Sequence, residues 1–240
     1  MRSMTALQQV STTQATDRAK PGVAARSFVA IGTILVIIAV AILPLLSSIF
    51  IHPTLDASGA AARLGVTAAE AHALSDASVS ELVLGPGSFA FNGPDGTPFY
   101  DGSERGHLRD ARLLLYLAIG VGIVAAGLIA TALVRASRSN RGVIWGAIAQ
   151  GAGASVIGVV TIGVLSLVAF GTLFTLFHQI FFPGGNFSFD PRTQHLVQLY
   201  PFGFWEIASA AFGLNIGIIG AITWLVARRR ARHDDAGRKR

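Results

Sequence analysis

The stretch FTLFHQIFFPGGNFSFDPR, residues 174–192, lies where a long apolar segment gives way to polar chain. Pro183 ends a helix at this point, because proline has no backbone N–H and its ring clashes with the preceding turn. Gly184 and Gly185 then free the backbone, since glycine tolerates positive φ. His178 lies about one helical turn before this break. The pattern therefore predicts a titratable imidazole at the end of an apolar helix.

The amino-acid composition is that of a membrane protein. Of the 240 residues, 52% are hydrophobic and only 13% are charged, and the mean hydropathy is +0.56. A soluble domain carries about 25% charged residues. The chain has no cysteine, which excludes disulfides, thiolate nucleophiles and thiolate metal sites.

Four apolar segments are long enough to cross a hydrocarbon core of about 30 Å. The first runs from Phe28 to Ile51, and we expect Pro44 to kink it. The third apolar stretch continues from Val143 to Phe182, or about 60 Å as one helix, which exceeds one crossing. We expect this span to end near Phe170 and to be followed by an interfacial helix that carries His178. The other two spans are expected at 113–134 and 205–227.

The distribution of lysine and arginine predicts the orientation. The N-terminal segment, the 135–141 loop and the C-terminal segment are basic, so they are expected to face the cytoplasm. We therefore predict an all-α polytopic membrane protein with four transmembrane helices, N-in/C-in, and a small extracytoplasmic cap between the first and second spans. These flanks also account for the net charge of +6 without nucleic acid, since no base-reading motif accompanies the charge.

The predicted organisation is a disordered cytoplasmic tail over 1–27, a four-helix membrane domain over 28–227 and a basic cytoplasmic tail over 228–240. The membrane domain includes the cap, 52–106, and an outer loop, 183–203. In the cap, Thr67-Ala-Ala-Glu70 resembles a capping box that starts a helix, and Ser78-Val-Ser-Glu81 is expected to start another turn. The sequence around Asn92-Gly-Pro-Asp-Gly96 predicts a β-hairpin. A cap of about 55 residues is too small to fold well alone.

This topology brings two histidines to the same leaflet. His107 precedes the second span, and His178 follows the third. Asp110 is three residues from His107, so a helix places both on one face. A carboxylate there can orient the imidazole and stabilise its protonated form. The pattern favours proton transfer at the outer surface.

Polar groups near the two histidines are candidates for binding a substrate. Arg112 and Arg192 are expected to hold an acidic or carbonyl group. Gly184, Gly185 and Asn186 are expected to offer N–H donors to a developing oxyanion. These candidates are Arg112, Gly184, Gly185, Asn186, Asp190 and Arg192.

Each of these residues also has a simpler interpretation. A histidine at a membrane interface can be merely solvated or bonded to a lipid headgroup, and Pro183-Gly-Gly can merely shape a turn. The phenylalanines between 181 and 189 are interpreted as an interfacial anchor. A zinc site of two histidines and an aspartate would lack a short-spaced histidine pair, so no metal is predicted. The remaining histidines are interpreted as surface residues: His52, His72, His195 and His233.

Two motifs carry a resemblance to a known family. Glu104-Arg-Gly-His-Leu-Arg-Asp-Ala-Arg112 is similar to a segment E-x-x-H-(L/M)-x-D-V-(R/K), and residues 177–191 are similar to F-H-x-I-F-F-P-G-N-N-W-x-F-D-P. Both patterns belong to the Lit family of bacterial integral membrane proteins, the lipoprotein intramolecular transacylases. The resemblance covers about residues 28–227 and includes the four-span plan. This chain departs from the patterns at Ala111, Gly185 and Phe187, and it keeps both histidines.

The resemblance implies acyl transfer within one lipoprotein. The substrate would carry a thioether-linked diacylglycerol on its N-terminal cysteine. The sn-2 acyl chain would move to the cysteine α-amine and give the lyso-form. His107 and His178 would transfer the protons, and Asp110 would orient His107. The implied partners are diacylated lipoproteins and membrane lipids, with the active site at the extracytoplasmic leaflet of the cell membrane, and no cofactor or external acyl donor is implied.

Two other functions remain open on the residues alone. A non-enzymatic membrane protein whose outer cap binds an envelope partner or lipid would need the same fold, and it would tolerate loss of either histidine. A channel or transporter would need an ion path, and the four spans carry scarcely any charge. Gln150 and Asn215 are explained by hydrogen bonds between helices. The sequence gives no indication of an oligomeric state.

Overall fold

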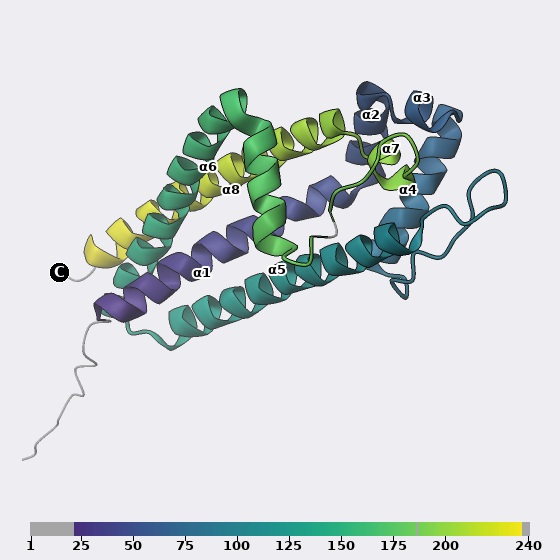
Figure 1. Cartoon of the computed structure of the whole chain (residues 1–240). Helices are drawn as coiled ribbons and strands as arrows, with labels where there is room; N and C mark the ends of the chain where they lie inside the picture. The colour runs from purple at the N-terminus through teal and green to yellow at the C-terminus, as the bar shows by residue number, and fades with distance from the viewer. Residues whose placement is uncertain (1–21, 186, 237–240) are drawn as a thin grey trace, which may run out of the picture.

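The computed structural model describes residues 22–185 and 187–236. These residues form helices joined by loops (Figure 1). The elements are α1 (Val23–Ile42), η1 (Leu43–Leu46), α2 (Ser48–Ser58), α3 (Ala60–Leu64), α4 (Ala68–Val83), α5 (Gly102–Arg135), α6 (Arg138–Phe181), α7 (His195–Leu199) and α8 (Phe202–Ala236). Most of the predicted N-terminal tail and the last residues of the predicted basic tail lie outside the described residues.

Four helical segments are long and apolar enough to cross a membrane. The mean hydropathy of their most apolar windows ranges from 1.9 to 2.9. Large apolar side chains lie exposed along α5 and α6, including Leu128, Ile157 and Leu167, as expected of surfaces that face lipid. The predicted all-α membrane protein with four spans is confirmed. The spans are Val23–Leu46, Gly102–Arg135, Asn140–Phe181 and Phe202–Asp234.

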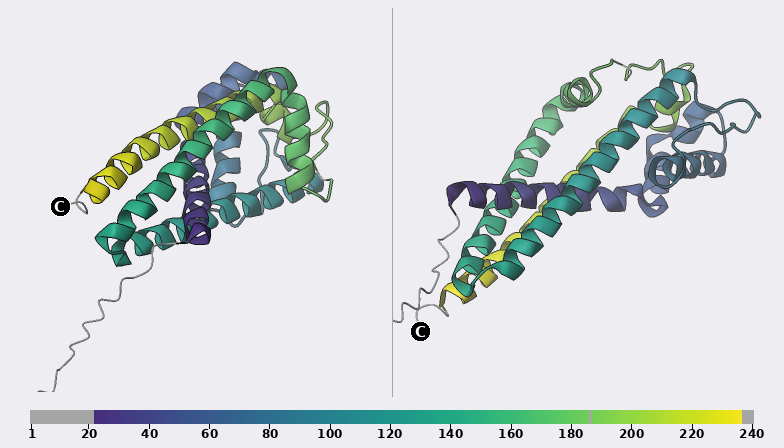
Figure 2. Two further views of the ribbon diagram at one scale, coloured as in Figure 1. Left: turned by 90° about the vertical axis from the view of Figure 1, so that its left-hand side faces the viewer. Right: turned by 90° about the horizontal axis from the view of Figure 1, so that it is seen from below.

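The long helices share two common ends. The start of α1, the turn between α5 and α6 and the end of α8 lie at one end, and α2, α3, α4 and α7 form the cap at the other (Figures 1 and 2). α6 packs against α8, and α1 crosses the bundle and packs on α5 and α6. The arginines of the α5–α6 turn and of the end of α8 therefore gather at the end opposite the cap.

The first span is broken where the sequence predicts a kink. α1 ends at Ile42, and Pro44 lies at the start of the 3-10 helix η1. Proline cannot supply the backbone N–H that a continuing α-helix would need. α2 begins at Ser48, so the last residues of the expected first span belong to the cap.

α6 changes direction at Ala169, which has non-helical φ and ψ of −142° and 30°. In Figure 1 the part of α6 beyond this bend turns back and descends toward α5. The bend lies between Ser166, whose hydroxyl donates to the carbonyl of Ile162, and Gly171. Serine and glycine are common at sharp helix bends. The expected break near Phe170 is confirmed, and the second part of α6 carries His178.

Small residues let α1 approach its neighbours closely. A Cβ at Gly122 would lie 2.4 Å from the Cβ of Ala39, and one at Gly151 would lie 2.2 Å from the carbonyl oxygen of Ala30. Such contacts are typical of helix packing in membranes. Asn215 donates from Nδ2 to the carbonyl of Ala41 at 3.1 Å, which confirms the predicted hydrogen bond between helices. Gln150 is instead exposed on α6.

The cap shares one hydrophobic core with the ends of the membrane helices. Phe89, Tyr100 and Leu199 are fully buried in it, together with Leu108 of α5 and Phe204 of α8. The Tyr100 hydroxyl is hydrogen-bonded to the hydroxyl of Ser78 at 2.8 Å in this core. The cap therefore gains part of its apolar burial from α5 and α8 as well as from its own helices.

Two predictions for the cap were wrong. Residues 88–100 form a loop with a single antiparallel bridge between Asn92 and Pro98, and the described residues contain no strand. Phe89 has a positive φ of 52°, which turns the chain so that its ring enters the core. Ser78 starts no new turn, because it lies inside α4 and its hydroxyl donates to the carbonyl of Leu74. The capping box of Thr67 and Glu70 is confirmed.

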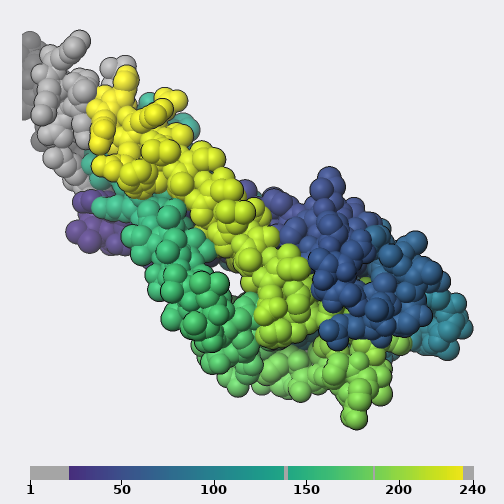
Figure 3. Space-filling model, turned by 90° about the horizontal axis from the view of Figure 1, so that it is seen from above, coloured from purple at the N-terminus to yellow at the C-terminus, as the bar shows by residue number. Residues whose placement is uncertain are grey.

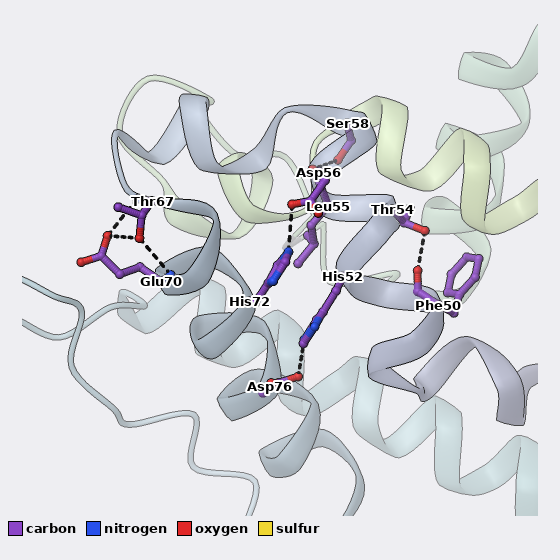
Figure 4. A network of polar contacts seen from close by, with 10 residues as sticks. All are labelled: Phe50, His52, Thr54, Leu55, Asp56, Ser58, Thr67, Glu70, His72 and Asp76. Atoms are coloured by element: carbon purple, nitrogen blue, oxygen red, sulfur yellow. Dashed lines mark hydrogen bonds and ion pairs between the residues drawn. The ribbon is translucent and has the colours of Figure 1, made fainter.

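His52 and His72, interpreted from sequence as surface residues, join α2 to α4. Their rings stack at 4.1 Å with an interplanar angle of 5°. Nε2 of His52 lies 2.9 Å from Asp76, and Nε2 of His72 lies 2.8 Å from Asp56 (Figure 4). Exposed ion pairs stabilise a fold only weakly. The stacking of two paired imidazoles adds a geometric constraint between the two helices.

Candidate active site

His107 and His178 lie next to each other, although they come from different helices. Their ring centroids are 5.9 Å apart, and the rings are nearly parallel at 18°. His107 is near the start of α5, and His178 is in the last turn of α6. The bend at Ala169 turns the end of α6 back toward α5 (Figure 1). The predicted proximity of the two histidines is confirmed.

Aromatic rings enclose the two imidazoles. The buried ring of Phe182 lies 4.5 Å from His107 and 5.4 Å from His178, centroid to centroid. Phe189 lies 5.4 Å from His107, and Phe187 lies 5.3 Å from His178. The interpretation of this aromatic run as an interfacial anchor stays a prediction, and these three rings also pack on the two histidines. Their rings displace water, which strengthens electrostatic interactions within the site.

The backbone fixes which nitrogen of His178 carries a proton. Nδ1 lies 2.8 Å from the carbonyl oxygen of Phe174, one turn earlier on α6. A carbonyl oxygen only accepts, so Nδ1 must be the donor. Nε2 of neutral His178 therefore has a lone pair that can take a proton. Nδ1 of His107 is buried in the same site.

The glycine turn follows directly after His178. The backbone N–H of Phe182 donates to the carbonyl of His178 at 2.7 Å and closes α6. Gly185 has a φ of 72°, and its N–H donates to the carbonyl of Phe182 at 3.1 Å. A Cβ at Gly184 would meet no atom within 4 Å, so this part of the turn is open. Asn186 lies outside the described residues.

Gln194 fastens the loop after the glycine turn to the start of α5. Its Oε1 accepts from the N–H of Asp190 at 2.8 Å. Its Nε2 donates to Asp101 at 2.9 Å and to Ser103 at 3.1 Å. Arg192 lies beside this link and forms an ion pair with Asp190 at 2.7 Å. The guanidinium of Arg192 is therefore engaged by its neighbour, and its proposed role toward a substrate would require that pair to open.

Glu104 is a buried carboxylate that joins α5 to α7. It is 1% exposed. One oxygen accepts from the N–H of Leu196 at 2.6 Å, and the other accepts from the N–H of Asp101 at 2.7 Å. His107 follows Glu104 by three residues on the same helix. Glu104 therefore fixes the first turn of α5, and with it the position of His107, against α7.

Sequence reasoning did not assign roles to Asp101 and Glu104. Asp101 caps α5, accepting from the N–H groups of Ser103 and Glu104, and the Glu104 side chain bonds back to the cap. This is a capping box, and Asp101-Gly-Ser-Glu104 has its spacing. The signal was present in the sequence. The bond to Leu196 was not visible there.

Asp101 makes the stability of this region depend on pH. Partial burial raises its pKa, but hydrogen bonds from Glu104, Ser103 and Gln194 outweigh burial and lower the pKa from 3.8 to about 2. The resulting stability is present above pH 3.8 and is lost as the pH falls through about 2.

Asp101→Ala should destabilise the protein by about 1 kcal/mol at neutral pH through loss of the cap. Asp101→Asn should keep most of the capping but remove this pH dependence, which thermal unfolding in detergent from pH 2 to 7 would measure. A wild-type acid response in Asp101→Asn would contradict the assignment.

Two other candidates lie further along α5. Asp110 is exposed one turn after His107, and its proposed role in orienting His107 remains a prediction. Arg112 donates to the carbonyl of Glu81 at 2.8 Å and to the hydroxyl of Tyr116 at 2.9 Å. These bonds fasten the end of α4 to α5. Arg112 is thus engaged in the fold, and its proposed binding of a substrate would compete with that contact.

The last two histidines lie apart from this pair. His195 was wrongly interpreted as a surface residue. It is partly buried, its Nδ1 is hydrogen-bonded to the carbonyl of Phe99, and its ring stacks on Phe99 at 4.7 Å. His233 is 89% exposed at the far end of α8, as predicted. Within residues 22–185 and 187–236, no group of three or more histidine, cysteine or acidic side chains is placed to hold a metal ion.

The arrangement is suited to proton transfer at one reacting group. Two imidazoles at 5.9 Å can both reach a substrate placed at the mouth of the glycine turn. One imidazole can take a proton while the other returns one, because neutral histidine ionises near physiological pH. The aromatic rings keep water away from the reacting atoms.

Comparisons with known proteins identify the fold and the family. A family model described as the lipoprotein intramolecular transacylase Lit matches residues 27–205. The solved structure of the membrane-integral Lit from Bacillus cereus superposes with a TM-score of 0.69 at 17% identity and covers 88% of this chain and 96% of that chain. A variant of that protein with one histidine replaced by arginine gives a TM-score of 0.64 at 16% identity, covering 88% and 92%. No curated protein matches the sequence significantly.

The structural likeness at these identities shows a shared fold, and the family model shows descent. Its match extends from the first membrane helix through the cap, both histidines and the glycine turn. It covers well over half of the 240 residues. The chain therefore belongs to the Lit family of lipoprotein intramolecular transacylases.

Proposed function

We propose that this protein moves the sn-2 acyl chain of a diacylated lipoprotein to the α-amine of that lipoprotein's N-terminal cysteine, with His107 and His178 transferring the protons. The observation that carries the proposal is the pair of imidazoles 5.9 Å apart, enclosed by phenylalanines beside an open glycine turn. Ester and amine belong to one molecule. Holding them together at the membrane surface raises their effective concentration, which lowers the entropic part of the barrier.

In the first step, the cysteine amine attacks the ester carbonyl. A C–N bond forms, and the amine nitrogen becomes positively charged until it loses a proton. His107 accepts that proton as the general base. Asp110, on the same side of α5, stabilises the imidazolium that results.

In the second step, the tetrahedral intermediate collapses and the C–O bond of the ester breaks. The proton that His107 accepted passes to Nε2 of His178, and His178 donates it from there to the departing glycerol oxygen, so both imidazoles return to their neutral forms. The bond from Nδ1 to the carbonyl of Phe174 supports this role, because it fixes the ring orientation and leaves Nε2 facing away from that carbonyl. The net change moves one acyl group and one proton in opposite directions, so no other reagent is consumed.

The oxyanion of the intermediate needs hydrogen-bond donors. The N–H of Gly185 is used within the turn, so we assign this role to the N–H of Gly184 and the side-chain amide of Asn186. The openness of the turn at Gly184 supports close approach of the substrate. Asp190 and Arg192 form the rim of the site. If their ion pair opened, the guanidinium of Arg192 could donate hydrogen bonds to the glycerol oxygens of the substrate.

The charge distribution supports one orientation of the protein in the membrane. The histidines lie at the cap end, and the arginines of the α5–α6 turn and of the α8 terminus lie at the other. The positive-inside rule then supports an N-in/C-in protein with its active site at the extracytoplasmic leaflet of the cell membrane. Diacylated lipoproteins and membrane lipids are the partners that this location offers.

His178→Asn should lower the rate of transfer by about 10²-fold or more, because it removes the acid that protonates the departing oxygen. Asparagine is a smaller side chain that can still donate one hydrogen bond, so the end of α6 should be preserved. The measurement is the amount of lyso-form lipoprotein per unit of expressed protein. Transfer at the wild-type rate would exclude His178 as the acid.

The function itself is tested by expressing the chain in a bacterium whose lipoproteins stop at the diacylglyceryl stage. Mass spectra of one lipoprotein's N-terminal peptide should show an acyl group on the α-amine with the total acyl count unchanged. A free amine, despite good membrane expression, would favour the other candidate, a non-enzymatic membrane protein whose cap binds an envelope partner. Such a protein would also tolerate loss of either histidine.

A further inference from the structure

A groove of 520 Å³ runs between α6 and α8 at the end of the molecule opposite the histidines. α6 and α8 lie side by side on the face shown in Figure 3. One wall carries Trp224, Arg228 and Arg232 of α8. The floor consists of α6 residues, which include the small Gly146 and Gly153 and also Gln150 and Ile157. The proposed acyl transfer uses none of these residues.

The two arginines of the groove share one face of α8. Arg228 and Arg232 are four residues apart, and Trp224 precedes Arg228 by another four, so all three project in the same direction. The guanidinium carbon of Arg228 lies 4.6 Å from the centre of the Trp224 ring. This cation–π contact holds the charge of Arg228 beside the Trp224 ring at the edge of the groove.

The charge of the groove is not neutralised by its own lining. None of the described residues that line it is acidic. The carboxylate of Asp234 lies instead in a second groove with Arg141 and Arg230, on another side of α8. Arg228 and Arg232 therefore offer two cations to a ligand that has negative charge.

The apolar part of the groove has the length of one membrane leaflet. It extends along α6 from Gly146 to Ile157, about 16 Å at about 1.5 Å per residue. Half of a hydrocarbon core of about 30 Å is of similar depth. Gly153 faces the indole of Trp224, and a Cβ there would lie 3.4 Å from the Trp224 ring, an ordinary van der Waals contact. The result is a shallow apolar channel that begins at two arginines.

From this geometry we propose that the groove binds an anionic glycerophospholipid of the leaflet opposite the active site. The lipid phosphate would accept from Arg228 and Arg232, since guanidinium groups bind phosphate through paired N–H bonds. One acyl chain would lie over the small residues of α6 beside Trp224. Basic pockets between membrane helices bind such headgroups, and each nearby arginine favours an anionic lipid. A zwitterionic lipid would fill the apolar channel but would gain less from the two charges.

The test is native mass spectrometry of the full-length protein, purified and then incubated with equal amounts of phosphatidylglycerol and phosphatidylcholine. The wild-type protein should retain phosphatidylglycerol about tenfold more than phosphatidylcholine. The double variant Arg228→Gln/Arg232→Gln should retain both lipids about equally. Arg229→Gln is the control for the single variant Arg228→Gln, because each removes one charge from the same run of arginines but Arg229 does not line the groove.

Two outcomes would overturn the proposal. One is a preference for phosphatidylglycerol that survives in the double variant. The other is a loss in Arg229→Gln equal to that in Arg228→Gln, which would show general attraction to the basic end. Ala154→Phe keeps both arginines and fills the channel at an exposed position, so it tests the site should the double variant fold poorly. It should also reduce retention of phosphatidylglycerol, and retention at the wild-type level would likewise overturn the assignment.

Discussion

Replacing His107 with glutamine should lower the rate of acyl transfer about 10²- to 10⁴-fold, the range that a single general acid or base contributes. Glutamine is similar in size and can fill the space beside Phe182, but its amide does not accept a proton near neutral pH. The attacking amine would then lose its proton only to water, which the aromatic rings largely exclude. Binding of the lipoprotein should change little, because the effect lies in the chemical step.

The rate is measured as lyso-form lipoprotein formed per unit of protein, by mass spectrometry of the N-terminal peptide. His233→Gln is the matched control, since this histidine is 89% exposed at the opposite end of the molecule. It should transfer at the wild-type rate. A normally expressed His107→Gln protein with undiminished transfer would exclude His107 as the base and would favour His178, whose Nε2 is also able to accept a proton.

Length and hydropathy were enough to predict the four spans and the bend in α6. A 44-residue helix is about 66 Å long, which no single crossing can use, so a break was expected. The direction of the bend could not be predicted, because it depends on how the segment beyond Ala169 packs against α5. The proximity of His107 and His178 followed from topology alone. Their distance and ring geometry required the structure.

The wrong predictions for the loop over 88–100 and for His195 have a common physical cause. The loop over 88–100 alternates aromatic and polar residues as a hairpin does, but its aromatic rings enter a core shared with α7 and α8. Tertiary burial therefore decided its backbone, including the positive φ of Phe89. His195 was misjudged for the same reason, since Phe99 covers its ring. Local patterns do not reveal partners that lie about a hundred positions away.

Glu104→Ala should reduce the free energy of unfolding by about 2 to 6 kcal/mol, because it leaves two backbone N–H groups without their acceptor at about 1–3 kcal/mol each. Those groups belong to Asp101 and Leu196. Glu104→Gln keeps one carbonyl oxygen and replaces the other by an amide donor, so it should lose about half as much. Glu206→Ala, which removes an exposed carboxylate from α8, is the control and should be near neutral. Thermal and denaturant unfolding in detergent would establish this order.

The same substitution should slow acyl transfer about tenfold to 10²-fold, since a shift of about 1 Å in a reacting group has such an effect. Glu104 holds the first turn of α5 against α7, and His107 lies on the next turn. A purely structural role predicts that the folded fraction of Glu104→Ala works at the wild-type rate well below its melting temperature. A positioning role predicts that this folded fraction remains slow and that Glu104→Gln recovers part of the rate. Full activity of folded Glu104→Ala would show that α5 holds His107 in place without its link to α7.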